Sequence, residues 1–255
     1  MTSKHAARIA FVTGMIGLGV VGLVFGDFAQ VWHSVPAWVP GRRALALASA
    51  VLMLACGIGL LSKRTQAPAS RALLYFWALA VVLVEVPVVV KHPLNEVAWQ
   101  GLAHLTVLLT GAWMLFTTVE RAVRIARLLF GLALIPIGLA HFVYLELTAP
   151  LVPAWLPYHV FWAYFTGAAQ LAAAVAVLLG IYARLAAALQ AVLLATFTFL
   201  VWPPLMLAAP TKAGLWSEFT ISWAMTAAAW VVAASITGGN VRSVESGDRA
   251  EDAVA

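Results

Sequence analysis

Five ionisable residues interrupt long apolar stretches of this 255-residue chain, and they are the residues best suited to chemistry: Asp27, Glu85, His104, His141 and Glu146. An ionised side chain within a membrane span costs about 2.5–3.5 kcal/mol on insertion scales, so each such residue needs a partner or a task. Carboxylates and imidazoles can exchange protons or hydrogen-bond to the polar head of a membrane-soluble ligand. A structural network of hydrogen bonds that clamps helices together is the alternative interpretation.

The five residues fall into two groups along the chain. In the first half, Asp27, Glu85 and His104 could form a cluster with Glu85 at its centre, in which carboxylate and imidazole satisfy one another. In the second half, His141 lies deepest in its apolar stretch, and Tyr144 follows three residues later, on nearly the same helix face. Glu146 is expected closer to the outer interface, where water lowers the cost of its charge.

The remaining inventory limits the cofactors that the chain can hold. Cys56 is the only cysteine, so neither an intrachain disulfide nor a cysteine-based metal cluster can form, and no metal site is predicted. A haem shared by His104 and His141 would have to lie between the two halves, and no pair of spaced histidines recurs, which disfavours haem. The sequence does not fix the cofactor; a quinone is a candidate, because the polar residues could exchange protons with its headgroup or hydrogen-bond to it.

The elements that carry these residues are predicted to be membrane-spanning helices. The chain is 64% hydrophobic and only 10% charged, whereas a soluble domain has about 25% charged residues. Runs of roughly 20 apolar residues are long enough to cross a bilayer as helices. We therefore predict an all-α, polytopic membrane bundle with about eight spans, at 9–31, 43–61, 72–90, 97–118, 125–147, 159–180, 184–207 and 214–236.

The distribution of positive charge is explained by the membrane topology, and it does not indicate nucleic-acid binding. Eleven Lys and Arg residues fall on the N-terminal side of these spans, and four fall on the opposite side: Arg42, Arg43, Lys91 and Lys212. The positive-inside rule then places both termini in the cytoplasm. No nucleic-acid partner is expected, and the lipid bilayer is the one certain environment.

An internal duplication organises the chain. The segment from Val35 to Pro40 returns as Val152 to Pro157, shifted by 117 positions, and tryptophans and prolines further along match at nearly the same shift. We predict two parallel four-helix repeats, 1–120 and 121–238, followed by a disordered cytoplasmic tail, 239–255. Each repeat carries a Trp-Pro loop on the outer face, either as an interfacial hairpin or as a ligand lid, with the residues Trp38, Pro40, Trp155 and Pro157.

The second repeat resembles the four-helix unit of DoxX-like membrane proteins. The resemblance rests on an ordered set of motifs: Gly138-Leu139-Ala140-His141-Phe142, the loop Val152–Pro157, Thr166-Gly167 with small residues after it, and Leu178-Leu179-Gly180. The first repeat matches more weakly, with Gly26-Asp27-Phe28 in place of Ala140-His141-Phe142. Gln170 stands where the family often has Glu. The resemblance implies a bacterial inner-membrane protein, and some relatives are subunits or partners of quinone-linked redox enzymes.

Three functions are consistent with this sequence. The first is a quinone-linked redox subunit, or a membrane partner of a soluble redox enzyme, in which Glu85, His104 and His141 exchange protons with a quinone headgroup. The second is a small-solute transporter or channel with its pathway between the repeats. The third is a non-catalytic membrane assembly protein. Whether the chain is an enzyme, and its oligomeric state, are not fixed by the sequence.

Overall fold

The computed structural model describes residues 3–29 and 35–236, and within them every regular element is a helix. This agrees with the predicted all-α class, whereas the predicted tail 239–255 lies outside the described residues. Two short segments, labelled η1 and η3, are π-helical, and η2 is a 3₁₀ turn. In chain order the elements are α1 (Ser3–Phe25), α2 (Arg42–Gly59), α3 (Gln66–Ala80), η1 (Val81–Glu85), α4 (Val86–Lys91), α5 (Glu96–Met114), α6 (Glu120–Val143), α7 (Leu145–Thr148), η2 (Ala149–Leu151), α8 (His159–Leu179), α9 (Ala183–Thr196), η3 (Phe197–Val201), α10 (Trp202–Ala208) and α11 (Ala213–Ser235).

Six helical stretches are long and apolar enough to cross a membrane, which fits the membrane protein expected from composition. They are Ser3–Phe25, Arg42–Gly59, Gln66–Lys91, Glu120–Val143, His159–Leu179 and Ala183–Ala208. Large apolar side chains such as Leu79, Leu83 and Val192 point outward from these helices. Lipid accommodates an apolar outer surface of this kind, whereas water does not.

Two predicted spans, 97–118 and 214–236, correspond to α5 and α11, which do not belong to these six. Both helices are central in the bundle: α5 packs against α3, α6 and α11, and α11 packs also against α1 and α9. Because they face other helices rather than lipid, they carry buried polar residues such as Gln100, Thr110 and Thr226. These residues lower the apolar content that a lipid-facing helix needs.

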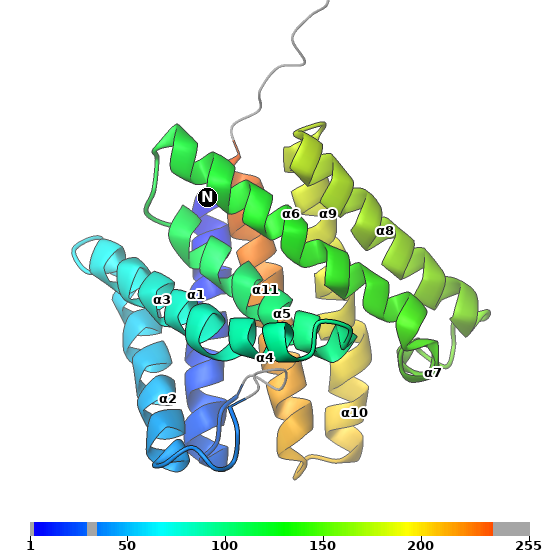
Figure 1. Cartoon of the computed structure of the whole chain (residues 1–255), viewed down its shortest axis with the longest axis horizontal. Coiled ribbons are helices and arrows are strands. Elements are labelled where there is room, and N and C mark those ends of the chain that lie inside the picture. Colours follow the sequence, from blue (N-terminus) through cyan, green and yellow to red (C-terminus); the bar gives the residue numbers. More distant parts are fainter. Residues whose placement is uncertain (1–2, 30–34, 237–255) are drawn as a thin grey trace, which may run out of the picture.

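Figure 1 shows two sets of helices that cross each other. In this view α1, α2, α11 and the stretch from α9 to α10 run in a similar direction, while α3, α5, α6 and α8 run obliquely across them. Small residues permit the close contacts at the centre. A Cβ added to Gly14 would come within 2.9 Å of the Ala224 Cα, and one added to Gly111 within 2.7 Å of the Ala228 Cβ.

The first helix differs from the prediction in its bounds. The span expected at 9–31 is α1, which begins at Ser3 and ends at Phe25. Gly26 follows with φ +67°, in the left-handed region that glycine adopts without strain, and its N–H bonds to the Gly22 carbonyl at 3.0 Å. Asp27 therefore lies after the helix rather than within it.

Two long helices contain a π-helical turn that the sequence pattern does not reveal. Gln66–Lys91 includes η1, and Ala183–Ala208 includes η3. Pro87 and Pro203 are the second residues of α4 and α10, directly after these turns. Proline lacks an N–H and its ring crowds the preceding turn, so the helix widens before it. The two turns place Glu85 and Phe197 at altered angles on their helices.

Candidate functional site

A cavity of about 530 Å³ lies among α5, α6, α8, the stretch from α9 to α10, and α11. It is within the range of about 300–1,000 Å³ that small-molecule sites occupy. His104 and His141 both line it, together with an aromatic group made up of Tyr144, Trp155, Trp162, Phe197 and Trp202. The cavity therefore brings together the two histidines that were predicted to lie within spans, which are 37 positions apart in the sequence.

His141 is held in one orientation by its own helix and by a stacked ring. Its Nδ1 lies 3.1 Å from the Ile137 carbonyl oxygen, one turn earlier on α6. Because a carbonyl only accepts, Nδ1 of the neutral ring carries the hydrogen, which leaves the Nε2 lone pair as an acceptor. Phe197 stacks on the imidazole with ring centroids 6.0 Å apart.

His104 lies on α5 one turn after Gln100, and both face the cavity. Gln100 is buried and donates from Nε2 to Glu96 Oε1 at 2.6 Å and to the Pro136 carbonyl at 2.9 Å. The bond to Pro136 joins α5 to α6 beside the histidines. Gln100 thus fixes the spacing of the two helices that carry His104 and His141.

Trp202 also lines this cavity. It is the first residue of α10, directly after η3, and its Nε1 is buried with no hydrogen-bond partner among the described residues. A buried indole N–H normally has a partner. A ligand with an acceptor oxygen would satisfy it.

Hydroxyl groups connect η3 to α11 next to the cavity. Thr198 Oγ1 lies 3.0 Å from Ser222 Oγ and 3.3 Å from Thr226 Oγ1, and it donates to the Leu194 carbonyl at 3.0 Å. Ser222 and Glu218, one turn apart on α11, line the cavity. These polar groups come from α5, α6, α10 and α11, and Thr148, Thr166 and Thr196 add hydroxyls from α7, α8 and α9, while the walls are mostly apolar.

The structure separates Asp27 from the other predicted residues. Its carboxylate pairs with Arg42 at 2.6 Å, where the two side chains are 50% and 31% exposed, and it also accepts from the Phe28 N–H. Arg42 stacks over the Phe28 ring at 5.5 Å. Asp27 thus belongs to a surface pair with Arg42 at the start of α2, and it lies after α1 rather than within that helix.

Glu85 and Glu146 lie outside the residues that line the cavity. Glu85 is fully buried on η1, as an intramembrane residue is expected to be, and Glu146 is exposed on α7. The two Trp-Pro loops also differ from each other. Trp155 lines the cavity although most of its side chain is exposed, whereas Trp38, Pro40 and Pro157 are exposed and take no part in it.

The sequence did not indicate Gln100, Phe197 or Trp202 as site residues. Gln100 carried a usable signal, since it precedes His104 by one helical turn in an apolar stretch. Phe197 and Trp202 are ordinary residues of a membrane helix, and only the π-helical turn brings them to the cavity. Within residues 3–29 and 35–236, no group of three or more His, Cys, Asp or Glu side chains could hold a metal ion.

A family described as "Domain of unknown function (DUF8561)" matches residues 130–233 of the chain. The match spans α6 from Phe130 through most of α11, and it contains every cavity-lining element except α5. Searches of curated proteins and of solved structures return no match.

Proposed function

We propose that the chain is a DoxX-like, multi-pass protein of the bacterial inner membrane, built from two parallel four-helix repeats. Helix positions support the duplication. The helices α1, α2, α3 and α5 begin 117 positions before α6, α8, α9 and α11, respectively. The π-helical turns η1 and η3 begin 116 positions apart, each followed by a proline.

Local geometry recurs at the same shift. Trp99 Nε1 donates to the Pro93 carbonyl at 2.9 Å, and Trp216 Nε1 donates to the Pro210 carbonyl at 2.8 Å. The residues before α2 and α8, Gly41 and Tyr158, both have positive φ, at 67° and 60°. A positive φ costs tyrosine steric strain that glycine avoids. The turn is therefore the same in both repeats although the residue type differs, because the surrounding fold holds it.

The charge distribution supports a topology with both termini in the cytoplasm. The helices α1, α3, α6 and α9 begin on the side that carries most of the Lys and Arg residues. A labelling experiment tests this. In a Cys56→Ser background, a cysteine placed at Lys63 should be protected from an impermeant thiol reagent added to intact cells, and one placed at Lys91 should react. The reverse pattern would refute the orientation.

We infer further that the cavity binds the headgroup of a membrane quinone. The observation that carries this inference is that two histidines from different repeats line one largely apolar cavity, with an unpartnered indole N–H beside them. The Trp202 N–H would donate to a quinone carbonyl, and the His141 Nε2 would accept from the hydroxyl of the reduced form. Phe197 and Trp162 supply aromatic faces for the ring.

The chain would then act as the quinone-binding membrane subunit for a soluble redox partner. Such a partner would deliver or remove the electrons, because the side chains that line the cavity are not redox groups. His104 and His141 would bind and orient the headgroup and exchange its protons. This role is consistent both with the resemblance to DoxX-like proteins, some of which are partners of quinone-linked enzymes, and with the position of the cavity.

The test is a titration of the full-length protein in mild detergent with decylubiquinone. Binding is measured as the quenching of tryptophan fluorescence. His104→Ala and His141→Ala should each weaken binding by about tenfold, as expected for the loss of one hydrogen-bonded group. His92→Ala, an exposed residue after α4, is the matched control and should bind like the parent protein. Equal affinity in all variants that remain folded, with no quinone in an organic extract, would refute the proposal and favour the transport or assembly readings.

A further inference from the structure

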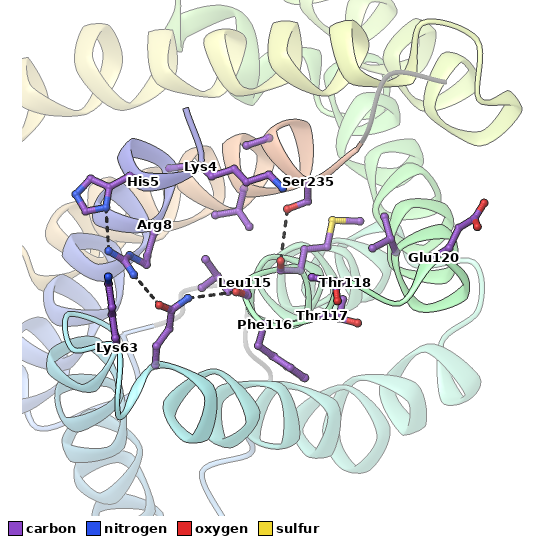
Figure 2. A pocket seen from close by; sticks show the side chains of 16 residues that line it. Lys4, His5, Arg8, Lys63, Leu115, Phe116, Thr117, Thr118, Glu120 and Ser235 are labelled. Carbon is purple, nitrogen blue, oxygen red and sulfur yellow. Dashed lines mark hydrogen bonds between the residues drawn. The ribbon is translucent and has the colours of Figure 1, made fainter. Parts of the chain in front are cut away.

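A second cavity, of about 760 Å³, lies at the end of the bundle that carries the N-terminus. Three helices begin beside it, α1, α3 and α6, and two end beside it, α5 and α11. Its lining contains a basic cluster, Lys4, His5, Arg8 and Lys63; Figure 2 shows His5 and Lys63 beside Arg8, while Lys4, at the start of α1, extends toward Ser235. None of these residues contributes to the histidine cavity.

Arg8 is fixed in place at this wall. Its Nη1 donates to Gln66 Oε1 at 2.6 Å, and Gln66 in turn donates to the Leu115 carbonyl at 3.3 Å. Its Nη2 lies 2.8 Å from His5 Nδ1, which must accept because a guanidinium only donates. Both contacts of the guanidinium are with neutral groups, so its charge is oriented but not neutralised.

Among the described residues, no carboxylate pairs with the cations of the cluster, Lys4, Arg8 and Lys63. Glu120 is the one acidic residue among those that line the cavity, and Figure 2 shows its side chain directed away from the basic cluster. The N-terminal ends of α1, α3 and α6 add the positive ends of three helix dipoles, against the negative ends of two, α5 and α11.

We propose that this cavity binds a phosphate group, which is a function separate from quinone binding. A fixed guanidinium with two exposed lysine ammonium groups suits an anion with several acceptor oxygens. The Arg8 Nε is buried and has no hydrogen-bond partner in the described ranges. The site lies at the ends of membrane-crossing helices, where headgroups of anionic phospholipids are found.

The source of the phosphate is either such a lipid or a soluble phosphate compound, and the experiment separates them. The full-length protein is titrated by calorimetry in detergent with short-chain phosphatidylglycerol, with the matching phosphatidylcholine, and with inorganic phosphate. Binding of phosphatidylglycerol but not phosphatidylcholine supports a lipid-headgroup site. Binding of inorganic phosphate with no preference for phosphatidylglycerol supports a soluble ligand.

Charge-removing variants test the residues. Lys4→Gln with Lys63→Gln should weaken anion binding by about tenfold while leaving the Arg8 contacts in place, and 0.5 M salt should weaken binding in the parent protein. Lys91→Gln with Lys212→Gln removes two exposed cations on the opposite side and is the matched control. Arg8→Lys keeps the charge but loses the planar fork and should also bind more weakly. Equal binding by all folded variants, or no binding of any anionic probe, would overturn the proposal.

Discussion

His141 on α6 and Phe197 on η3 lie nearly parallel, with ring centroids 6.0 Å apart and 22° between their planes. This contact exists because the π-helical turn widens the helix just before Trp202 and Pro203. The same turn brings Trp202 to the cavity. Helix irregularity, rather than the regular period of an apolar helix, therefore assembles the aromatic wall of the site.

Two glutamines in the second half of the chain are expected to reduce its stability. Gln170 on α8 and Gln190 on α9 are 0% and 1% exposed, and neither amide has a hydrogen-bond partner among the described residues. Met53 and Leu73 occupy the positions 117 residues earlier and are equally buried. Gln170→Met and Gln190→Leu should therefore each raise the free energy of unfolding by about 1–3 kcal/mol.

Thermal unfolding in detergent measures this effect, with Gln100→Met as the contrasting variant. The Gln100 amide has two partners, so its replacement should lower the melting temperature. A lower melting temperature for Gln170→Met as well would contradict the prediction and would indicate that its amide bonds to a bound water or ligand.

The surface pair of Asp27 and Arg42 should contribute little to stability. Both side chains are partly exposed, and solvent screens such pairs to about 0–1 kcal/mol. Asp27→Asn should accordingly change the melting temperature only slightly in low salt and not at all in high salt. A large loss would mean that Asp27 acts within a buried cluster, as the sequence alone suggested.

The sequence was informative wherever apolar composition decides the structure. The places of the helices followed from apolar runs, because a lipid-facing surface demands them. The end of α1 was missed by six residues, since Leu23, Val24 and Phe25 merge with the apolar residues beyond Gly26. The cavity could not be predicted from the sequence for another reason. A gap between His104 and Trp202 depends on how the helices tilt, and no local sequence pattern encodes that tilt.

Glycines at the centre of the bundle are predicted to be intolerant of larger residues. A Cβ on Gly111 would meet the Ala228 Cβ at 2.7 Å and Phe11 at 3.0 Å, whereas one on Gly214 would meet nothing within 4 Å. Gly111→Val should destabilise the protein by about 1–3 kcal/mol through overpacking between α5 and α11. Gly214→Ala, also in a helix, should be neutral or stabilising because alanine favours helices. Similar melting temperatures for the two variants would show that α5 and α11 do not pack this closely.

Removing a single donor offers the sharpest test of the quinone site. Trp202→Phe retains an aromatic ring but loses the Nε1 hydrogen, so decylubiquinone should bind about tenfold more weakly, with little change in the melting temperature. Trp216→Phe is the matched control, because the Trp216 N–H already donates to the Pro210 carbonyl outside the cavity. That variant should lose some stability and keep its affinity. If Trp202→Phe binds the quinone as tightly as the parent protein does, the indole donates to no ligand oxygen, and the headgroup must be oriented by His104 and His141 alone.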